Sequence, residues 1–245
     1  MAGARGYRED VAYVHDAGFR DYALNAAPGL LQVLRANGVW EGLIVDLGCG
    51  SGRWAAELNR SGYDVMGIDQ SPSMIQLARG IAPASKFRIG SLWRAKLPAC
   101  DAVTSIGECL NYRFDASNRR VALRSLFARV YRALRAGGVF VIDFAELDRL
   151  PKQMPRRSWF EGRGWAILVS VSGDRKRNLL RREIVCFRKA GKLFRRSVEI
   201  HMLRLYRTRD LLRELTRVGF TARAVKGYGR FRFPAGIAGI VAVKD

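Results

Sequence analysis

Short apolar runs alternate with amphipathic stretches along the first 144 residues of the chain. The runs have the length of strands and lie at residues 43–46, 64–68, 101–105 and 139–144, and a further strand of mixed polarity is predicted at 86–89. The stretches between them have apolar residues at helical spacing, and they predict helices at 53–61, 72–79 (capped by Ser71) and 117–135. Strands that alternate with helices form a parallel sheet with helices on both faces, so this part of the chain predicts an α/β fold.

The pattern changes at both ends of this region. Residues 7–38 predict two helices with a break at 27–29, where Pro28 suits the first turn of the second helix. After residue 145 the helical spacing gives way to strands joined by tight turns at Gly173-Asp174 and Ala190-Gly191, and the strands lie at 165–171, 179–188 and 193–205. In the last of these strands, alternate residues project to opposite faces. One face carries Val198, Ile200 and Met202, and the other carries Glu199, His201 and Leu203.

The last 38 residues complete the sheet. A helix at 208–218, capped by Thr208 and ended by Gly219, precedes a closing hairpin of strands 220–227 and 237–243. The sequence therefore predicts a Rossmann-like, mostly parallel sheet of seven strands with helices on both faces, plus a small antiparallel insertion.

A glycine-rich loop follows the first predicted strand. The strand ends in Asp46, and glycines then stand at three alternate positions, Gly48, Gly50 and Gly52. Glycine allows positive φ and leaves no Cβ in the way of a ligand. The next strand ends in Asp69, and an acid at that place can accept hydrogen bonds from both hydroxyls of a ribose. Together these residues predict a nucleoside-binding unit.

The loop is not that of a dinucleotide site. Arg53 stands where the third glycine of G-x-G-x-x-G belongs, and Asp46 would repel a pyrophosphate. The acid suits a ligand that carries an ammonium group.

These residues resemble the first motif of the class I S-adenosylmethionine-dependent methyltransferases. Later segments resemble further motifs of that family in the expected order: 67–74 (GIDQSPSM), 105–112 (SIGECLNY) and 134–143 (LRAGGVFVID), where Ala136 replaces the usual proline. The resemblance implies S-adenosylmethionine as cofactor, S-adenosylhomocysteine as product, and no metal. It places the cofactor against Asp46, Gly48, Cys49, Gly50, Gly52, Asp69, Gln70, Met74, Ser91, Leu92 and Gly107. Ser91 stands where the family often has an aspartate that binds the adenine amine, and the Leu92 backbone is the substitute we expect.

The resemblance also implies how the chain is divided. We expect residues 1–42 to form N-terminal helices on the acceptor side. Residues 43–144 and 208–245 would form the cofactor-binding core, and residues 145–207 an inserted antiparallel cap.

Methyl transfer needs an aligned acceptor and, where the acceptor carries a proton to be removed, a group that takes it. The candidates for that group are His15 in the N-terminal segment, Glu108 after the fourth strand, and His201, which shares a strand face with Glu199. Acceptor-lining residues are expected to be Tyr13, Tyr112, Glu199, Arg204 and Tyr228. A nucleophilic role for Cys109 is disfavoured, because cytosine-C5 methyltransferases have a proline beside that cysteine and this chain has Glu108 and Leu110.

The charge of the chain bears on the partner. The formal net charge is +21, and 25 basic against 9 acidic residues lie in 145–245. Such a field favours an acidic partner. We therefore expect transfer by direct in-line displacement to an oxygen or nitrogen atom of a small molecule, with an anionic acceptor as one option. Two alternatives stay open: a nucleic-acid methyltransferase or binding module that uses the basic C-terminal half, and a cofactor-binding protein without catalysis.

The remaining sequence features concern location and assembly. No apolar run is long enough to span a bilayer, and the N-terminus lacks the apolar core of a signal peptide. The four cysteines have no C-x-x-C spacing, which indicates buried thiols in a reducing cytoplasm and no metal site. The expected form is a cytoplasmic monomer or homodimer.

Overall fold

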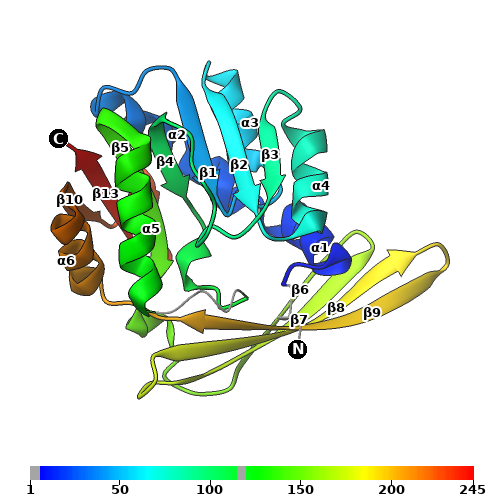
Figure 1. Ribbon diagram of the computed structural model, residues 1–245. Helices are drawn as coiled ribbons and strands as arrows, with labels where there is room; N and C mark the ends of the chain where they lie inside the picture. The colour runs from blue at the N-terminus through cyan, green and yellow to red at the C-terminus, as the bar shows by residue number, and fades with distance from the viewer. Residues whose placement is uncertain (1–5, 115–119) are drawn as a thin grey trace.

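The computed structural model of the chain describes residues 6–114 and 120–245, with the side chains of 120–122 left aside. A seven-stranded sheet has the order β10-β13-β5-β4-β1-β2-β3. Its strands are β1 (Leu43–Leu47), β2 (Asp64–Asp69), β3 (Lys86–Ile89), β4 (Cys100–Ser105), β5 (Leu134–Ala145), β10 (Phe220–Val225) and β13 (Ile237–Lys244). Only β13 runs antiparallel to its neighbours in this sheet. The predicted Rossmann-like fold is confirmed (Figure 1).

Helices cover both faces of this sheet. They are α2 (Asp21–Ala36), α3 (Arg53–Arg60), α4 (Pro72–Ile81), α5 (Arg120–Ala133) and α6 (Thr208–Val218), whereas α1 (Glu9–Phe19) packs against α4 and the inserted strands described next. On one face α2 and α3 bury residues such as Leu34 and Leu58, and on the other α5 and α6 bury Phe127 and Leu215. Each buried aliphatic or aromatic side chain stabilises the fold by about 1.5–3 kcal/mol. The inner strands β1, β4 and β5 are therefore buried on both faces over most of their length, whereas β3, at the edge, is mostly exposed.

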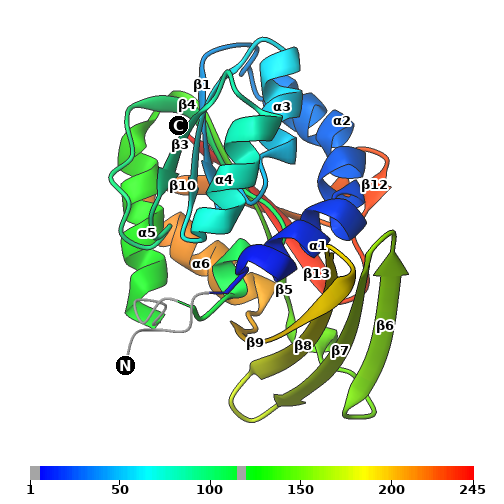
Figure 2. The ribbon, with the colours of Figure 1, turned by 90° about the vertical axis from the view of Figure 1, so that its right-hand side faces the viewer.

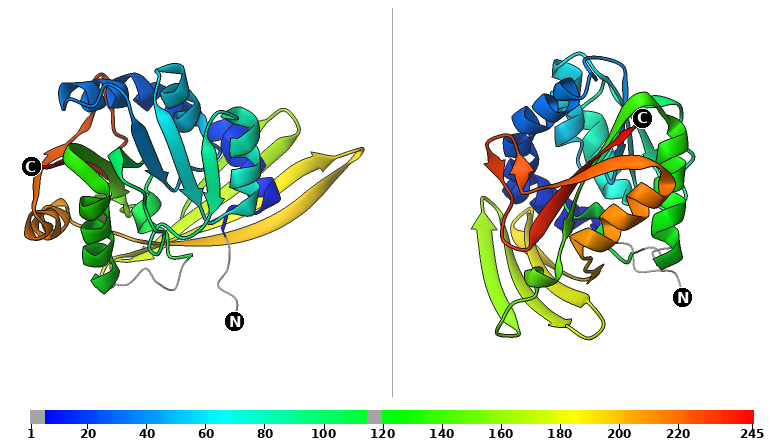
Figure 3. Two further views of the ribbon diagram at one scale, coloured as in Figure 1. Left: turned by 45° about the horizontal axis from the view of Figure 1, so that its top comes forward. Right: turned by 90° about the vertical axis from the view of Figure 1, so that its left-hand side faces the viewer.

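A second sheet of four antiparallel strands follows β5 in the chain. Its order is β6-β7-β8-β9, and its strands are β6 (Arg156–Gly162), β7 (Trp165–Asp174), β8 (Leu179–Ala190) and β9 (Leu193–Arg204). It lies beyond the carboxyl ends of the parallel strands, and α1 lies between the two sheets (Figures 1 and 2). The hairpin of β8 and β9 extends past the edge of the larger sheet (Figure 3). The smaller elements are η1 (Cys109–Asn111), η2 (Leu147–Arg149) and the hairpin of β11 (Gly227–Tyr228) with β12 (Phe231–Arg232). The division of the chain into three domain parts stays a prediction, because sheet membership alone does not define folding units.

The expected break at 27–29 is wrong. The first helix ends at Phe19, and Pro28 lies inside α2. Next to it, a Cβ added to Gly29 would lie 2.0 Å from the carbonyl oxygen of Tyr228. The glycine is therefore explained by close packing of α2 on β11, and it does not mark a helix start.

Three smaller expectations also differ from the structure. Strand β6 was not predicted, because nearly all its residues are exposed and show no alternation. Helix α5 ends at Ala133, and the expected start at 117 lies outside the described residues. Thr208 does not cap α6 through its own side chain; its hydroxyl donates to Glu146 Oε1 over 2.6 Å.

Strand β9 buries its more polar face. Glu199, His201 and Leu203 are buried, whereas Ile200 on the opposite face is 46% exposed. The N-terminal segment donates two backbone N–H groups to this carboxylate, and the imidazole bonds to the carboxylate itself.

Candidate functional site

The glycine loop between β1 and α3 has the backbone that its sequence predicts. Gly48, Gly50 and Gly52 all have positive φ, of 79°, 53° and 77°. The loop is held against β2, because the N–H groups of Gly48 and Cys49 donate to the carbonyl oxygen of Ile68. Gly50 lines a cavity, and a Cβ built on it would meet no atom within 4 Å. A side chain at this position would therefore project into space that a ligand can occupy.

Asp69 closes β2 beside this loop. Its Oδ2 accepts from the Gly50 N–H over 3.0 Å, and its Oδ1 accepts from the Ser71 N–H over 2.8 Å. Burial raises the pKa of the carboxyl, although these N–H groups oppose the shift. Since each carboxylate oxygen has a second lone pair, Asp69 can still accept bonds from a ligand's hydroxyls.

Asp46 lies deeper, at the end of β1. It is 3% exposed, and its Oδ1 accepts from the Thr104 hydroxyl over 2.7 Å. Thr104 in turn accepts from the Trp54 indole N–H over 3.2 Å. Burial, together with the charge of Asp69, raises the pKa of Asp46 to about 7. A cation beside it would favour the charged carboxylate, so Asp46 suits a ligand that carries an ammonium group.

One cavity of about 730 Å³ joins this loop to the inner face of the four-stranded sheet. Most of the residues expected to bind a cofactor line it: Asp46, Gly48, Cys49, Gly50, Asp69, Gln70, Met74, Ser91, Leu92 and Gly107. Gly52 is not part of the lining; a Cβ there would contact Ala78 and Phe87. The far wall is mainly aliphatic and consists of Ile167, Val169, Val171, Leu180 and Ile184.

His15, on α1, lines this cavity. Its Nδ1 is buried and has no hydrogen-bond partner within the described structure. Burial lowers the pKa of the imidazole to about 4, so His15 is neutral at pH 7 and can accept a proton. The edge of its ring meets Tyr7, with ring centroids 5.1 Å apart.

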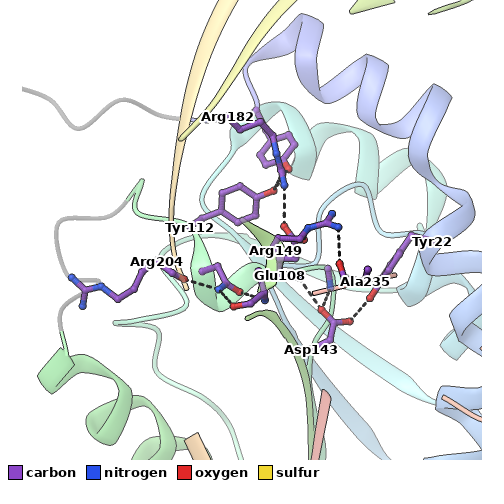
Figure 4. Close-up of polar contacts among 12 residues, drawn as sticks. Tyr22, Glu108, Tyr112, Asp143, Arg149, Arg182, Arg204 and Ala235 are labelled. Atoms are coloured by element: carbon purple, nitrogen blue, oxygen red, sulfur yellow. Dashed lines mark hydrogen bonds and ion pairs between the residues drawn. The ribbon is translucent and has the colours of Figure 1, made fainter. Parts of the chain in front are cut away.

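Glu108 also lines the cavity, but both of its carboxylate oxygens are engaged. Arg149 Nε lies 3.2 Å from Oε1, and Arg182 Nη2 lies 3.2 Å from Oε2 (Figure 4). The residue has a left-handed backbone, with φ of 63°, which is uncommon outside glycine. Its N–H and that of Gly107 donate to Asp143 Oδ1 over 2.8 and 2.7 Å. This arrangement fixes Glu108 as an anchor for two guanidinium groups.

His201 does not line the cavity. Its ring is buried behind Tyr7 and Phe114, with ring centroids 4.8 and 4.7 Å away. Its Nε2 is 2.8 Å from Glu199 Oε2, and burial lowers the pKa of the imidazole. His201 therefore does not contact the cavity itself; it packs against Tyr7 and Phe114, which line the cavity.

Glu199 holds the N-terminal segment against the four-stranded sheet. It accepts from the backbone N–H groups of Tyr7 and Arg8, each over 2.7 Å. The Tyr7 carbonyl oxygen accepts from the hydroxyl of Ser71, two residues after Asp69, over 2.6 Å. The segment before α1 thus connects the inserted sheet to the nucleoside loop.

The other expected acceptor residues are spread over the structure. Tyr112 lines the cavity, and its hydroxyl lies 2.6 Å from that of Tyr7. Tyr13 lies outside the lining, where Arg188 stacks 4.0 Å above its ring. Tyr228 is fully buried, with its hydroxyl 3.5 Å from Asp143 Oδ2. The side chain of Arg204 points away from the Glu108 cluster (Figure 4).

Sequence reasoning missed three groups at the site. Arg182, on β8, is half-buried and donates to the Tyr112 hydroxyl over 3.1 Å. Tyr22 donates to Asp143 Oδ2 over 3.0 Å, and burial raises the pKa of Asp143 to about 6. A signal existed for Arg182, because it alternates with Leu180 and Ile184 and so shares their strand face. Tyr22 and Asp143 had no comparable local signal.

The described part of the chain holds no group of three or more His, Cys, Asp or Glu side chains arranged to bind a metal ion. Within that part, no helix is both long and apolar enough to cross a membrane.

A family profile described as "Methyltransferase domain" matches residues 44–138. A protein of Geobacillus sp. (strain WCH70) named as a methyltransferase is 30% identical over 105 residues, which are 41% of this chain and 41% of that protein. The magnesium-protoporphyrin O-methyltransferase of Rhodobacter capsulatus is 32% identical over 96 residues, or 37% of this chain and 42% of that enzyme. The chain thus spans about two fifths of the length of these curated relatives.

Solved structures share the fold over nearly the whole chain. An S-adenosylmethionine-dependent methyltransferase of Clostridium acetobutylicum superposes with a TM-score of 0.80 at 18% identity, covering 95% of this chain and 97% of that one. A sugar N-methyltransferase of Streptoalloteichus sp. superposes with a TM-score of 0.78 at 21% identity, covering 100% of this chain and 95% of that one. An S-adenosylmethionine-bound amino pentose methyltransferase of Micromonospora echinaspora superposes with a TM-score of 0.71 at 19% identity, covering 98% of each chain.

Proposed function

We propose that this chain is a class I S-adenosylmethionine-dependent methyltransferase, which the family profile over residues 44–138 and the shared fold support. The chain would transfer a methyl group from S-adenosylmethionine to an oxygen or nitrogen atom of a small molecule by direct in-line displacement. The observation that carries the proposal is the single cavity that joins the glycine loop to the inner face of the four-stranded sheet. Two ligands that react with each other must share one enclosed space, and this cavity provides it.

The loop half of the cavity fits the cofactor. Asp69 has acceptor capacity left for the ribose hydroxyls, Asp46 can pair with the ammonium group, and Gly50 leaves the space that a Cβ would fill. When bound, S-adenosylmethionine supplies a methyl carbon made electrophilic by the sulfonium. The remaining work of this chain is to orient the acceptor, exclude water and take a proton.

The other half of the cavity fits an organic acceptor of modest size. Its wall is aliphatic on β7 and β8, and polar groups enter from α1, α2 and η2. Cavities with a mostly apolar lining and few polar groups are typical of small-molecule sites. The sugar and amino pentose methyltransferases among the similar structures act on acceptors of this kind, which supports a small-molecule acceptor here.

His15 is our proposed proton acceptor. It lines the cavity and is neutral at pH 7, so its imidazole can accept a proton. Glu108 would act by positioning, since two arginines hold its oxygens. His201 would act by supporting Tyr7 from behind.

A nucleic-acid acceptor is less well supported. Several basic residues that the alternative relies on are paired within the chain. Arg195 bonds to Glu9 and Asp10, Arg181 pairs with Glu183, and Arg182 pairs with Glu108. Arginines that are already paired contribute less to binding phosphates, because each would first have to leave its carboxylate.

Calorimetry with S-adenosylhomocysteine tests the cofactor half. We expect binding by the parent protein and a loss of about tenfold or more in Asp69→Asn, since hydrogen bonds to a charged acceptor are worth about 1.5–3 kcal/mol. Asp64→Asn is the matched control, because Asp64 lies at the opposite end of the same strand and is exposed. No binding by the folded parent would refute the proposal. Titration of tRNA and duplex DNA at low salt tests the alternative, and absence of tight binding removes it.

A further inference from the structure

Arg156 stands at the start of β6 and lines the acceptor half of the cavity. It is exposed, and among the described residues its guanidinium has no hydrogen-bond or ion-pair partner. The other arginines near Glu108 are engaged by that carboxylate. Arg156 is therefore a cation that faces the cavity with its binding capacity unused.

The strand register places Arg156 on the inner face of the sheet. Arg156 pairs with Val171, and Val171 pairs with Arg182. Directly opposite residues on antiparallel strands project to the same face, so Arg156 and Arg182 flank Val171 on one side of the sheet. Two strand spacings separate their Cα atoms by about 10 Å. The next residue, Arg157, projects to the outer face.

The charges around this half of the cavity do not balance. Four arginines line it against two acids: Arg20, Arg149, Arg156 and Arg182 against Asp21 and Glu108. The wall between them is aliphatic, and Val169 and Val171 belong to it. Arg156 is exposed, so water partly screens its attraction for an anion, and the aliphatic wall adds apolar contact for the rest of the ligand.

We propose that Arg156 binds an anionic group of the methyl acceptor, a carboxylate or a phosphate, while the acceptor's apolar part packs on Val169 and Val171. The inference rests on the proposed function, because it names the acceptor class of the same cavity. Arg204, which the sequence predicts to line the acceptor site, is not part of the lining.

A pair of fluorescent dyes, one anionic and one neutral, tests whether Arg156 binds an anion, and the experiment does not require that the acceptor be identified. The dye 8-anilinonaphthalene-1-sulfonate carries an anion on an apolar body, and N-phenyl-1-naphthylamine is its neutral counterpart. We expect Arg156→Gln to weaken binding of the anionic dye by about fivefold and to leave the neutral dye unchanged. Arg157→Gln is the matched control, since a dye bound on the outer face would depend on that residue. Displacement of the anionic dye by benzoate or by phenyl phosphate then distinguishes the two anion chemistries.

Three results would overturn the proposal: an equal effect of both variants, no effect of Arg156→Gln, or an equal loss of both dyes in Arg156→Gln. Thermal melting of each variant checks that it folds. Binding of S-adenosylhomocysteine is measured separately in the same proteins. Its absence in the parent would refute the cofactor site alone, because the dye comparison does not use that ligand.

Discussion

The backbone N–H of Tyr7 donates to Glu199 Oε2 over 2.7 Å, and this bond joins two residues 192 positions apart in the chain. Glu199 also accepts from the Arg8 N–H and contacts His201 Nε2. Because the Tyr7 carbonyl oxygen accepts from Ser71, the same residue reaches the loop that follows Asp69. One buried carboxylate thus couples the inserted sheet to the cofactor half through the N-terminal segment.

Glu199→Gln tests this coupling. An amide has one acceptor oxygen, so one of the two N–H groups loses its partner, and we expect the free energy of unfolding to fall by about 2 kcal/mol. We also expect faster release of S-adenosylhomocysteine, because the Tyr7 segment is then less firmly held beside Ser71. Urea denaturation and stopped-flow dissociation measure the two effects. Glu183→Gln is the control, since Glu183 is half-exposed and pairs with Arg181 only at the surface. Equal behaviour of the two variants would contradict the coupling.

Gly50→Ala tests whether the space beside the glycine loop belongs to the ligand. Gly50 and Gly62 both have positive φ, and a Cβ at either would meet no atom within 4 Å. Alanine should therefore destabilise both positions by a similar 1–2 kcal/mol or so. Only Gly50 lines the cavity, so only Gly50→Ala should weaken binding of S-adenosylhomocysteine, by about tenfold or more. Calorimetry and thermal melting of both variants decide this, and unchanged binding in Gly50→Ala would place the cofactor elsewhere.

The cofactor half could be predicted from the sequence because its determinants are local. Glycines with positive φ and acids at strand ends occupy a few consecutive positions, and the strands between them are apolar on both faces. The acceptor half depends on contacts between distant segments. Glu199 and His201 are buried because Tyr7 and Arg8 reach them, and no neighbouring residue signals this. Strand β6 escaped prediction since its polar, exposed residues show no alternation, and Arg156 was missed with it.

The pH dependence of cofactor binding should report on Asp46. Its pKa of about 7 in the free protein means that the carboxyl gains a proton as the pH falls below 7. The protonated acid no longer attracts the ammonium group, so affinity for S-adenosylhomocysteine should fall by up to about tenfold per pH unit below 7 and level off above it. Asp46→Asn should bind more weakly at pH 8 and lose most of this dependence. Calorimetry between pH 5.5 and 8.5 makes the comparison. Asp143, with its pKa of about 6, is present in both proteins, so its titration does not distinguish them. Parallel curves would contradict the assignment.

His15→Ala separates a proton-accepting role from a structural one. We expect kcat for the acceptor found by screening to fall by about a hundredfold, since general bases contribute two to four powers of ten. Affinity for S-adenosylhomocysteine should change little, because His15 would act on the acceptor. Between pH 5 and 8 the profile of kcat in the parent should show no titration of His15, whose pKa is about 4. His201→Ala should instead lower stability, and Glu108→Gln should raise KM because Arg149 and Arg182 lose their shared anchor. If His15→Ala, His201→Ala and Glu108→Gln all lower kcat by less than about threefold, none of these residues is the base. The acceptor would then be an amine that is neutral before transfer, and the methylated ammonium product would release its proton to water.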